Sequence, residues 1–422
     1  MKTTRKKQLK ASRILFLAML TLIAAACSKD DGPSEPPVGT NPPIILDCDF
    51  FNTDQVLVDD PGAPVDYIIT CETHVKAKLT VEPGVVIAFE PSAALFVEEA
   101  ASLTMNGTEA KPIILTGVEK EKGLWNGVLI ESIKESNSMK YVTIEYAGNQ
   151  SVSHSGGVYP AGLQVIKGGD VTIDHCTFQH CKDNGLFWSS SKYISITNSI
   201  FTKNDVPMKT VGWNQIELYN NTNSYTGNVN DYVDMQYPGI SYDNKKITWH
   251  KIDVPYYITT RIYNRFDVDH AQLVIEPGTD IIMATAETHM RILEDASITA
   301  VGTAEDPIIF RGKNGVKADW GYIDIYRSGS ALNEIGFAEI KDAGGNMADI
   351  QAAVQVYDNS YLNIHDVNFT NNAGYAVGMK YAAAMADPVL DHNNLSVDNG
   401  KKFCIGKNGS AISDPNDPDS TI

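Results

Sequence analysis

Two nearly matching segments, almost two hundred residues apart, constrain the fold of this chain more than any other feature. LTVEPGVVIAF occupies 79–89 and LVIEPGTDIIM occupies 273–283. Other matches keep an offset of 194 to 196 residues: NGTEAKPIILTG (106–117) with VGTAEDPIIFRG (301–312), Trp125 with Trp320, and VTIEYAG (142–148) with FAEIKDAG (337–344). This period is too long for one unit of a solenoid, so the sequence predicts a tandem duplication of a larger module.

A shorter repeat lies inside each copy. TIDHCTF at 172–178 returns as SITNSIF at 195–201, a spacing of 23 residues, and the second copy holds NIHDVNF at 363–369. Short strands that point alternate residues inward, separated by Asn, Asp and Gly turns, produce this pattern. A 23-residue return fits one full coil of a parallel solenoid.

Residues 64–400 resemble right-handed parallel β-helix proteins, particularly Bacteroidetes lipoproteins with the ordered motifs L-x-I-x-P-G-T-x-I, G-T-x-x-x-P-I-x-F and W-x-G-I. The resemblance implies an all-β fold, a right-handed parallel β-helix built from two tandem modules. Pro83-Gly84 and Pro277-Gly278 are then the turn of an early coil in each copy, with Gly supplying the left-handed φ. These motifs specify a fold and no reaction.

The N-terminus predicts where the protein goes. Residues 1–26 combine a basic start with an apolar run too short to span a bilayer, which indicates a signal peptide. The run ends in IAAAC and resembles a bacterial lipobox, with Cys27 as the lipidated residue, and the following CSKDDGPSE resembles a surface-export signal. We therefore expect residues 27–45 to be a flexible tether that anchors the protein in the outer membrane, exposed at the cell surface.

The remaining boundaries follow from the repeat. We expect an N-terminal cap and lead-in at 46–78, a first β-helix module at 79–253, a second at 254–400 and a C-terminal tail at 401–422. Cys48 and Cys71 are disulfide candidates that would close a loop in the cap. The cap and the segment 381–422 would cover the open strand edges at the two ends.

Charge limits the partners. The formal net charge is -18, and removing the six basic residues of the signal peptide leaves 28 basic residues against 52 acidic ones, or -24. Such a surface repels nucleic acid, and no basic cluster reverses this locally. An acidic polysaccharide would bind unfavourably unless calcium or a local Lys/Arg site intervened.

Catalytic motifs are weak. VTIDHCTF at 171–178 resembles a family 1 pectate lyase signature through Asp174 and His175, but Thr172 replaces the signature Trp and no R-x-P-x-x-R is present. His175, Cys176, His180 and Cys181 have the composition of a metal cluster, yet the strand pattern turns Cys176 to the core and splits the set between faces. We assign no catalytic residue, metal site or cofactor, and leave calcium open.

Aromatic residues give the better indication of function. Between 211 and 263 lie eight of the 19 tyrosines and two tryptophans. Trp213, Tyr256 and Tyr257 are the ligand-binding candidates, since flat amphipathic rings stack on sugars and anchor proteins. The alternative is that these rings only fill the coils.

The sequence therefore favours a cell-surface lipoprotein that binds a polysaccharide or a surface protein without catalysis, as an adhesin-like or glycan-binding module. One alternative is a polysaccharide lyase or glycoside hydrolase, which would show carboxylates, alone or with a Lys or Arg, clustered in one groove. Another is a structural spacer, which would show no aromatic cleft.

Overall fold

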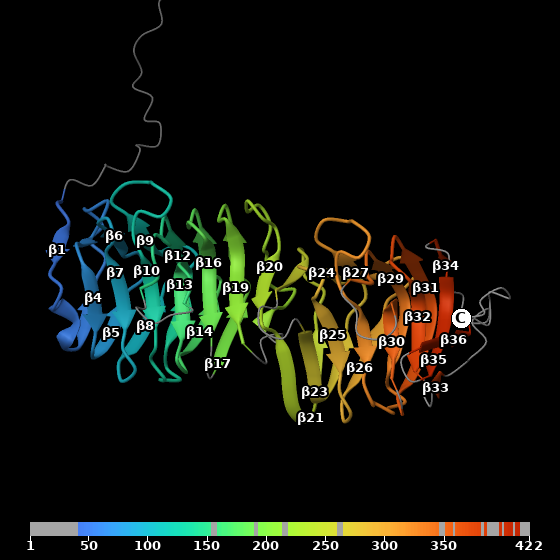
Figure 1. Ribbon diagram of the computed structural model, residues 1–422. Coiled ribbons are helices and arrows are strands. Elements are labelled where there is room, and N and C mark those ends of the chain that lie inside the picture. The colour runs from blue at the N-terminus through green and yellow to red at the C-terminus, as the bar shows by residue number, and fades with distance from the viewer. Residues whose placement is uncertain are drawn as a thin grey trace, which may run out of the picture. The chain divides into compact units, whose positions relative to one another are not determined.

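Short parallel strands make up almost all the regular structure of the computed structural model (Figure 1). The structure describes residues 41–152, 158–189, 193–212, 218–259, 265–345, 351–357, 359–380, 384–385, 396–398, 401–407 and 410–413. A short 3-10 turn, η1 (Phe50–Asn52), precedes β2, and among these residues no helix is long and apolar enough to cross a membrane. The prediction of an all-β fold is confirmed.

Strands of successive coils pair in register and form five stacks. Stack 1 holds β1 (Ile44–Leu46), β3 (Tyr67–Ile69), β6 (Val86–Phe89), β9 (Ile113–Gly117), β12 (Val142–Glu145), β15 (Thr177–Gln179) and β18 (Ile200–Thr202). Stack 2 holds β2 (Gln55–Leu57), β5 (Lys78–Val81), β8 (Ser102–Asn106), β11 (Ser138–Lys140), β14 (Asp170–Asp174) and β17 (Tyr193–Thr197). Stack 3 holds β4 (Glu72–Val75), β7 (Ala94–Val97), β10 (Gly127–Ile130), β13 (Ala161–Ile166), β16 (Asn184–Ser189), β19 (Val206–Val211), β20 (Val233–Gln236), β22 (Tyr256–Thr259), β24 (Asp280–Met283) and β27 (Ile308–Gly312).

The remaining strands continue the fold. Stack 3 goes on through the second halves of β29 (Glu334–Lys341) and β31 (Tyr361–Thr370) to β34 (Ser396–Val397). Stack 4 holds the first halves of β21 (Gly239–Trp249) and β23 (Arg265–Ile275), then β25 (His289–Ile292), β28 (Ile323–Ile325), β30 (Ala352–Val356), β32 (Tyr375–Lys380) and β35 (Lys401–Lys407). Stack 5 holds the second halves of β21 and β23, β26 (Ser297–Val301), the first halves of β29 and β31, and β33 (Ala384–Met385).

These pairings define a parallel β-helix. All are parallel except the final one, in which β36 (Ser410–Ser413) runs antiparallel to β35. The range 401–422, expected to be a tail, therefore contributes two strands. The 23-residue return predicted from the sequence is the real coil length at β14 and β17, where Thr172 pairs with Ser195.

Alternation of apolar and polar residues explains the strands. Along β9 the buried side chains Ile113 and Leu115 alternate with half-buried neighbours, as expected where one face of a strand lines a core. The predicted Pro-Gly turns lie between strands, and φ is +96° at Gly84 and +76° at Gly278. A side chain with a Cβ is strained at such φ values, so glycine is required there.

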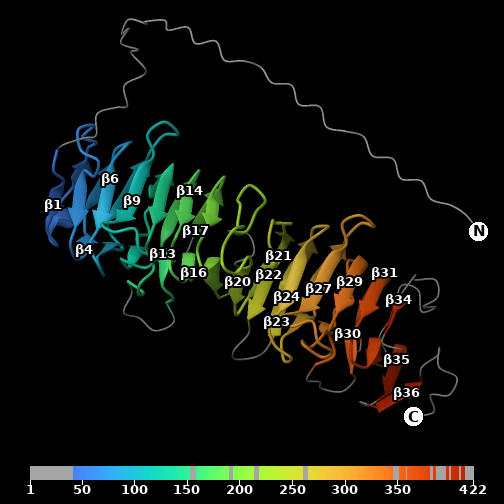
Figure 2. The ribbon, with the colours of Figure 1, turned by 90° about the horizontal axis from the view of Figure 1, so that it is seen from above.

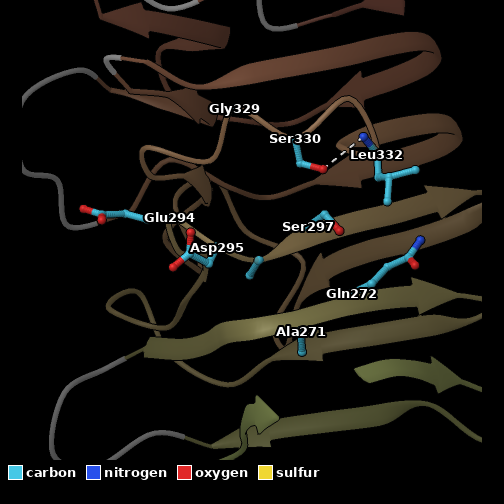
Figure 3. Close-up of a pocket in the computed structure, with 9 residues that line it drawn as sticks. Ala271, Gln272, Glu294, Asp295, Ser297, Gly329, Ser330 and Leu332 are labelled. Carbon is cyan, nitrogen blue, oxygen red and sulfur yellow. Dashed lines mark hydrogen bonds between the residues drawn. The ribbon is translucent and has the colours of Figure 1, made fainter. Parts of the chain in front are cut away.

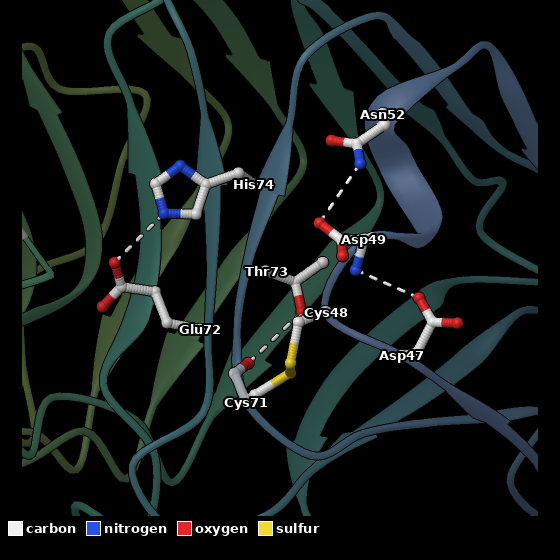
Figure 4. Close-up of a disulfide and its surroundings, with 8 residues drawn as sticks. All are labelled: Asp47, Cys48, Asp49, Asn52, Cys71, Glu72, Thr73 and His74. Atoms are coloured by element: carbon white, nitrogen blue, oxygen red, sulfur yellow. Dashed lines mark hydrogen bonds and ion pairs between the residues drawn. A yellow bond between two sulfur atoms is a disulfide. The ribbon is translucent and has the colours of Figure 1, made fainter.

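The N-terminal segment begins the β-helix as well as covering its end. Cys48 and Cys71 form a disulfide beside η1, and Thr73 donates a hydrogen bond to the Cys71 carbonyl (Figure 4). β1 already pairs with β3, and β2 pairs with β5. The cap predicted for 46–78 therefore includes the first coil strands.

Stack 3 changes its role between the two predicted copies. In the sequence alignment β6 matches β24, yet β6 lies in stack 1, whereas β24 continues stack 3 through β20 and β22 (Figure 2). In the same way β7 of stack 3 matches β25 of stack 4. Equivalent strands of the two copies therefore belong to different stacks, shifted by one around the β-helix.

The same kinds of buried hydrogen bond occur at corresponding positions of the two predicted copies. The indole of Trp125 donates to the carbonyl of Glu145 at 2.9 Å, and that of Trp320 donates to the carbonyl of Lys341 at 2.6 Å. Asn137 accepts from the amide of Leu103 at 2.8 Å, and Asn333 accepts from the amide of Ile298 at 3.1 Å. Each Asn also donates to a buried Ser, Ser132 or Ser328.

We predict that Asn137→Ala and Asn333→Ala each lower the free energy of unfolding by about 1–3 kcal/mol, because each leaves buried backbone groups without a partner. Urea unfolding measures this, with the exposed Asn230→Ala as control. Equal stability of all three variants would contradict the structural role given to these side chains.

Candidate functional site

Tyr256 and Tyr257 are neighbours on β22 and face opposite sides of the strand. Tyr256 is fully buried, its hydroxyl donates to the carbonyl of His250 at 2.6 Å, and its ring packs against Trp249 with centroids 5.0 Å apart. The Tyr256 ring therefore fills the core and cannot contact a ligand at the surface. Tyr257 lies on the outer side of the strand but is only 9% exposed, because it packs against Tyr232, Ile282 and Ala284, with the Tyr232 ring centroid 4.5 Å away. The third candidate, Trp213, lies outside the described residues.

A row of outward side chains crosses stack 3 at this point. The register places Lys209 of β19, Asp234 of β20 and Tyr257 of β22 on adjacent strands. Lys209 Nζ lies 2.6 Å from Asp234 Oδ2, and the two side chains are only 14% and 12% exposed. Thr259 also donates to Asp234 Oδ1 at 3.1 Å. No sequence motif indicates Lys209 and Asp234, because only the register between coils brings these two residues together.

Tyr159 covers one end of the row. Lys209 Nζ lies 4.2 Å from the centroid of the Tyr159 ring, a cation–π contact, and the Tyr159 hydroxyl donates to Gln236 Oε1 at 2.8 Å. At the other end Lys313 Nζ lies 5.3 Å from the centroid of the Tyr257 ring. We call Tyr159, Lys209, Tyr232, Asp234, Gln236 and Tyr257 the Tyr257 face.

Asp183 brings a second carboxylate close to this face. Burial raises the pKa of Asp183, Lys209 lowers it, and the nearby Asp205 and Asp234 raise it, so the net shift is upward. A raised pKa means that this carboxyl keeps its proton to a higher pH than an ordinary Asp does.

Asp174 and His175, the pair that resembles the lyase signature, lack a carboxyl with a raised pKa. Burial raises the pKa of Asp174, but hydrogen bonds from Asn198, His175 and Thr197 outweigh burial and bring it down to about 2. Such a carboxylate is a poor base. His175 stacks on Tyr141 with centroids 4.7 Å apart, next to an Asp174 Oδ1 that is 2.9 Å from its Nδ1. The contacts of this pair stabilise a turn.

The two core cysteines are free thiols. Cys176 and Cys181 are fully buried, and burial raises the pKa of each to about 12. The predicted inward direction of Cys176 is confirmed, and His180 stacks on Tyr146 away from the thiols. Across the described part of the chain no group of three or more His, Cys, Asp or Glu side chains could hold a metal ion.

A polar groove of about 450 Å³ lies in the second copy (Figure 3). Gln272 and Ser297 line it from β23 and β26, and Ser330 and Leu332 line it from the loop after β28. The carboxylates of Glu294 and Asp295 lie together at one end of it (Figure 3). No sequence motif indicated this groove, because its residues come from three consecutive coils.

Comparison with known proteins supports the fold and names no activity. A family model described as a right handed beta helix region matches residues 86–245, which is less than half of the chain. The fold is accordingly a right-handed parallel β-helix. No curated protein and no solved structure matches the chain.

The Tyr257 face suits a ligand with both apolar and hydroxyl surfaces. Tyr232 offers a half-buried ring, and the fold holds Lys209 and Asp234 just beneath it, while Tyr257 at 9% and Gln236 at 2% exposure can meet a ligand only at their edges. Binding sites commonly combine aromatic walls with a few fixed polar groups.

We predict that Asp234→Ala lowers the free energy of unfolding by roughly 3 kcal/mol, because it leaves the largely buried Lys209 ammonium without its carboxylate. The double variant Lys209→Met, Asp234→Leu should stay within about 1 kcal/mol of the parent chain, since apolar residues replace the pair. Chemical denaturation compares the three. A double variant as unstable as Asp234→Ala would show that the pair stabilises the fold.

We predict a pH dependence at Asp183. Because its pKa in the folded chain is raised above the ordinary value of 3.8, the folded state holds its proton more tightly, and stability falls as pH rises from that value through the raised pKa. Asp183→Asn removes this titration and should gain stability relative to the parent chain as pH increases from 3.5 to 7. Parallel urea midpoints across that range would refute the assignment.

Proposed function

We propose that this chain is a lipid-anchored cell-surface protein that binds a carbohydrate ligand on the Tyr257 face without transforming it. The N-terminal signal with Cys27 and the tether at 27–45 support the location outside the cell. One observation carries the choice of ligand: a nearly buried Lys209–Asp234 pair lies between outward tyrosine rings. Sugar rings present an apolar face to aromatic side chains and hydroxyls to charged partners.

Burying the Lys209–Asp234 pair costs the fold hydration energy. A largely buried ion pair gives little net stability relative to apolar residues of the same size, because both charges lose their hydration. Earlier in the same row of stack 3 the outward positions are apolar at Phe96 and Leu129, so the fold does not require charge there. A ligand that hydrogen-bonds the pair supplies a reason for keeping it.

We predict that Tyr257→Ala weakens carbohydrate binding by about tenfold, corresponding to a lost aromatic anchor worth about 1–2 kcal/mol. The soluble chain from Ser28 onward is screened against host and plant polysaccharides, and affinity for the retained ligand is then measured by calorimetry. Tyr361→Ala on stack 5 is the matched control and should bind normally. Unchanged binding by a folded Tyr257→Ala variant would remove this face from the proposal.

A second candidate function is polysaccharide cleavage by hydrolysis or elimination. The raised pKa of Asp183, beside the Lys209–Asp234 ion pair, supports it, since a carboxyl that keeps its proton to a higher pH than an ordinary Asp is better suited to act as a general acid. The same polysaccharide panel is assayed for new reducing ends and for unsaturated products. Product formation that Asp183→Asn abolishes would replace the binding proposal with an enzymatic one.

A further inference from the structure

Beyond the N-terminal segment, arginine occurs only in a short part of the chain. The sequence has seven arginines, and the five that follow position 13 all lie between positions 261 and 327. Arg311 pairs with Asp280 on stack 3, with its Nη2 2.9 Å from Asp280 Oδ2. Arg265, Arg291 and Arg327 instead belong to stack 4 or to the turn directly after it. The first copy contains no arginine.

The first copy serves as an internal control for this surface. At an offset of 195 residues Arg291 corresponds to Phe96, and Asp324 corresponds to Leu129. Phe96 and Leu129 are register neighbours on β7 and β10, just as Arg291 and Asp324 are on β25 and β28. In the first copy these positions belong to an apolar cluster. The architecture is therefore compatible with apolar residues where the second copy has a buried ion pair.

That ion pair is nearly removed from water. Arg291 Nε lies 2.9 Å from Asp324 Oδ2, and the two side chains are 19% and 0% exposed. Burial of this kind costs hydration energy that the ion pair only partly returns. A ligand that binds the Arg291 guanidinium would explain why an ion pair stands here in place of the apolar pair of the first copy.

The surrounding residues form a second face. Two guanidinium groups contact the Tyr326 ring, with Arg291 Cζ 4.8 Å and Arg327 Cζ 5.2 Å from its centroid. Tyr357 packs beside Tyr326 with ring centroids 5.1 Å apart. Arg327 and its partner Glu294 are both more than half exposed, with 3.2 Å between Arg327 Nη1 and Glu294 Oε1. An exposed pair of this kind is weak and can exchange for a ligand.

We propose that Arg291, Tyr326 and Arg327 form a second binding site, separate from the Tyr257 face, for the carboxylate of an acidic polysaccharide. Guanidinium groups bind carboxylates through paired N–H donors, which is why arginine suits this task better than lysine. The Tyr326 ring supplies a stacking surface for the sugar that carries the carboxylate.

Local charge and the neighbouring groove decide how an acidic polymer would bind. The chain is strongly acidic overall and both arginines already pair with carboxylates, so the polymer must displace the exposed Glu294 from Arg327 to reach that guanidinium. Glu294, the exposed partner of Arg327, also lines the polar groove of Figure 3. The groove's Gln272, Ser297 and Ser330 offer hydrogen bonds for a neighbouring sugar residue.

The test uses the soluble chain from Ser28 onward with polygalacturonate, its methyl ester and dextran sulfate as probes. We expect the parent chain to bind polygalacturonate. Arg327→Gln should lower this affinity at least tenfold, and the parent chain should bind the methyl ester at least tenfold more weakly than polygalacturonate. Arg311→Gln is the matched control, since this arginine also pairs with an aspartate but lies on stack 3, and it should bind as the parent chain does. Tighter binding of dextran sulfate than of polygalacturonate would assign the site to sulfate and overturn the carboxylate proposal.

Arg291→Gln removes the guanidinium that pairs with the buried Asp324 and could destabilise the fold, so the double variant Arg291→Met, Asp324→Leu restores the apolar character of the first copy. This variant should melt as the parent chain does and lose polygalacturonate binding. Normal binding by Arg327→Gln and by the folded double variant would overturn the proposal. Tyr257→Ala separates the two sites, because loss of polygalacturonate binding in Tyr257→Ala alone would transfer this ligand to the Tyr257 face.

Discussion

Hydrogen bonding between successive coils is the constraint on which the rest of this structure depends. In a parallel stack the backbone N–H and C=O groups of each inner strand hydrogen-bond to the strands of the preceding and the following coil. These bonds fix the register of every coil relative to its neighbours. Side chains at equivalent positions then form continuous rows. Inward rows, such as Phe178, Phe201 and Tyr225, stack their rings in the core. Outward rows bring together residues about one coil apart in sequence, which is how Lys209 meets Asp234.

The change of stack places the matching segments of the two predicted copies on different outward faces of the β-helix. β24 continues stack 3, although its sequence counterpart β6 lies in stack 1. By the same shift, Phe96 lies on stack 3, whereas its sequence counterpart Arg291 lies on stack 4. The two surfaces have also diverged in chemistry, from apolar in the first copy to charged in the second. A single continuous ligand track along equivalent positions is incompatible with this arrangement.

Sequence reasoning predicted the coil fold because its signals are local. Pro83-Gly84, the 23-residue return and the alternation in TIDHCTF each depend on a few neighbouring residues, and the structure has them as predicted. The site depends on register between coils, which no local pattern contains. Tyr256 and Tyr257 show the difference: both rings fit a binding stretch, but strand alternation turns the first into the core and the second to the outer side of the strand, where neighbouring side chains cover all but 9% of it. The change of stack was equally invisible, because it arises where β20 and β22 join the copies.

The central claim is that outward rows of the β-helix bind the ligand while inward aromatics only pack. A crystal structure of the soluble chain with the oligosaccharide it retains tests this most directly. The account predicts sugar density against the outer surface of stack 3 at Tyr257 or of stack 4 at Tyr326. Density confined to stacks 1, 2 or 5, or to an end of the β-helix, would contradict it.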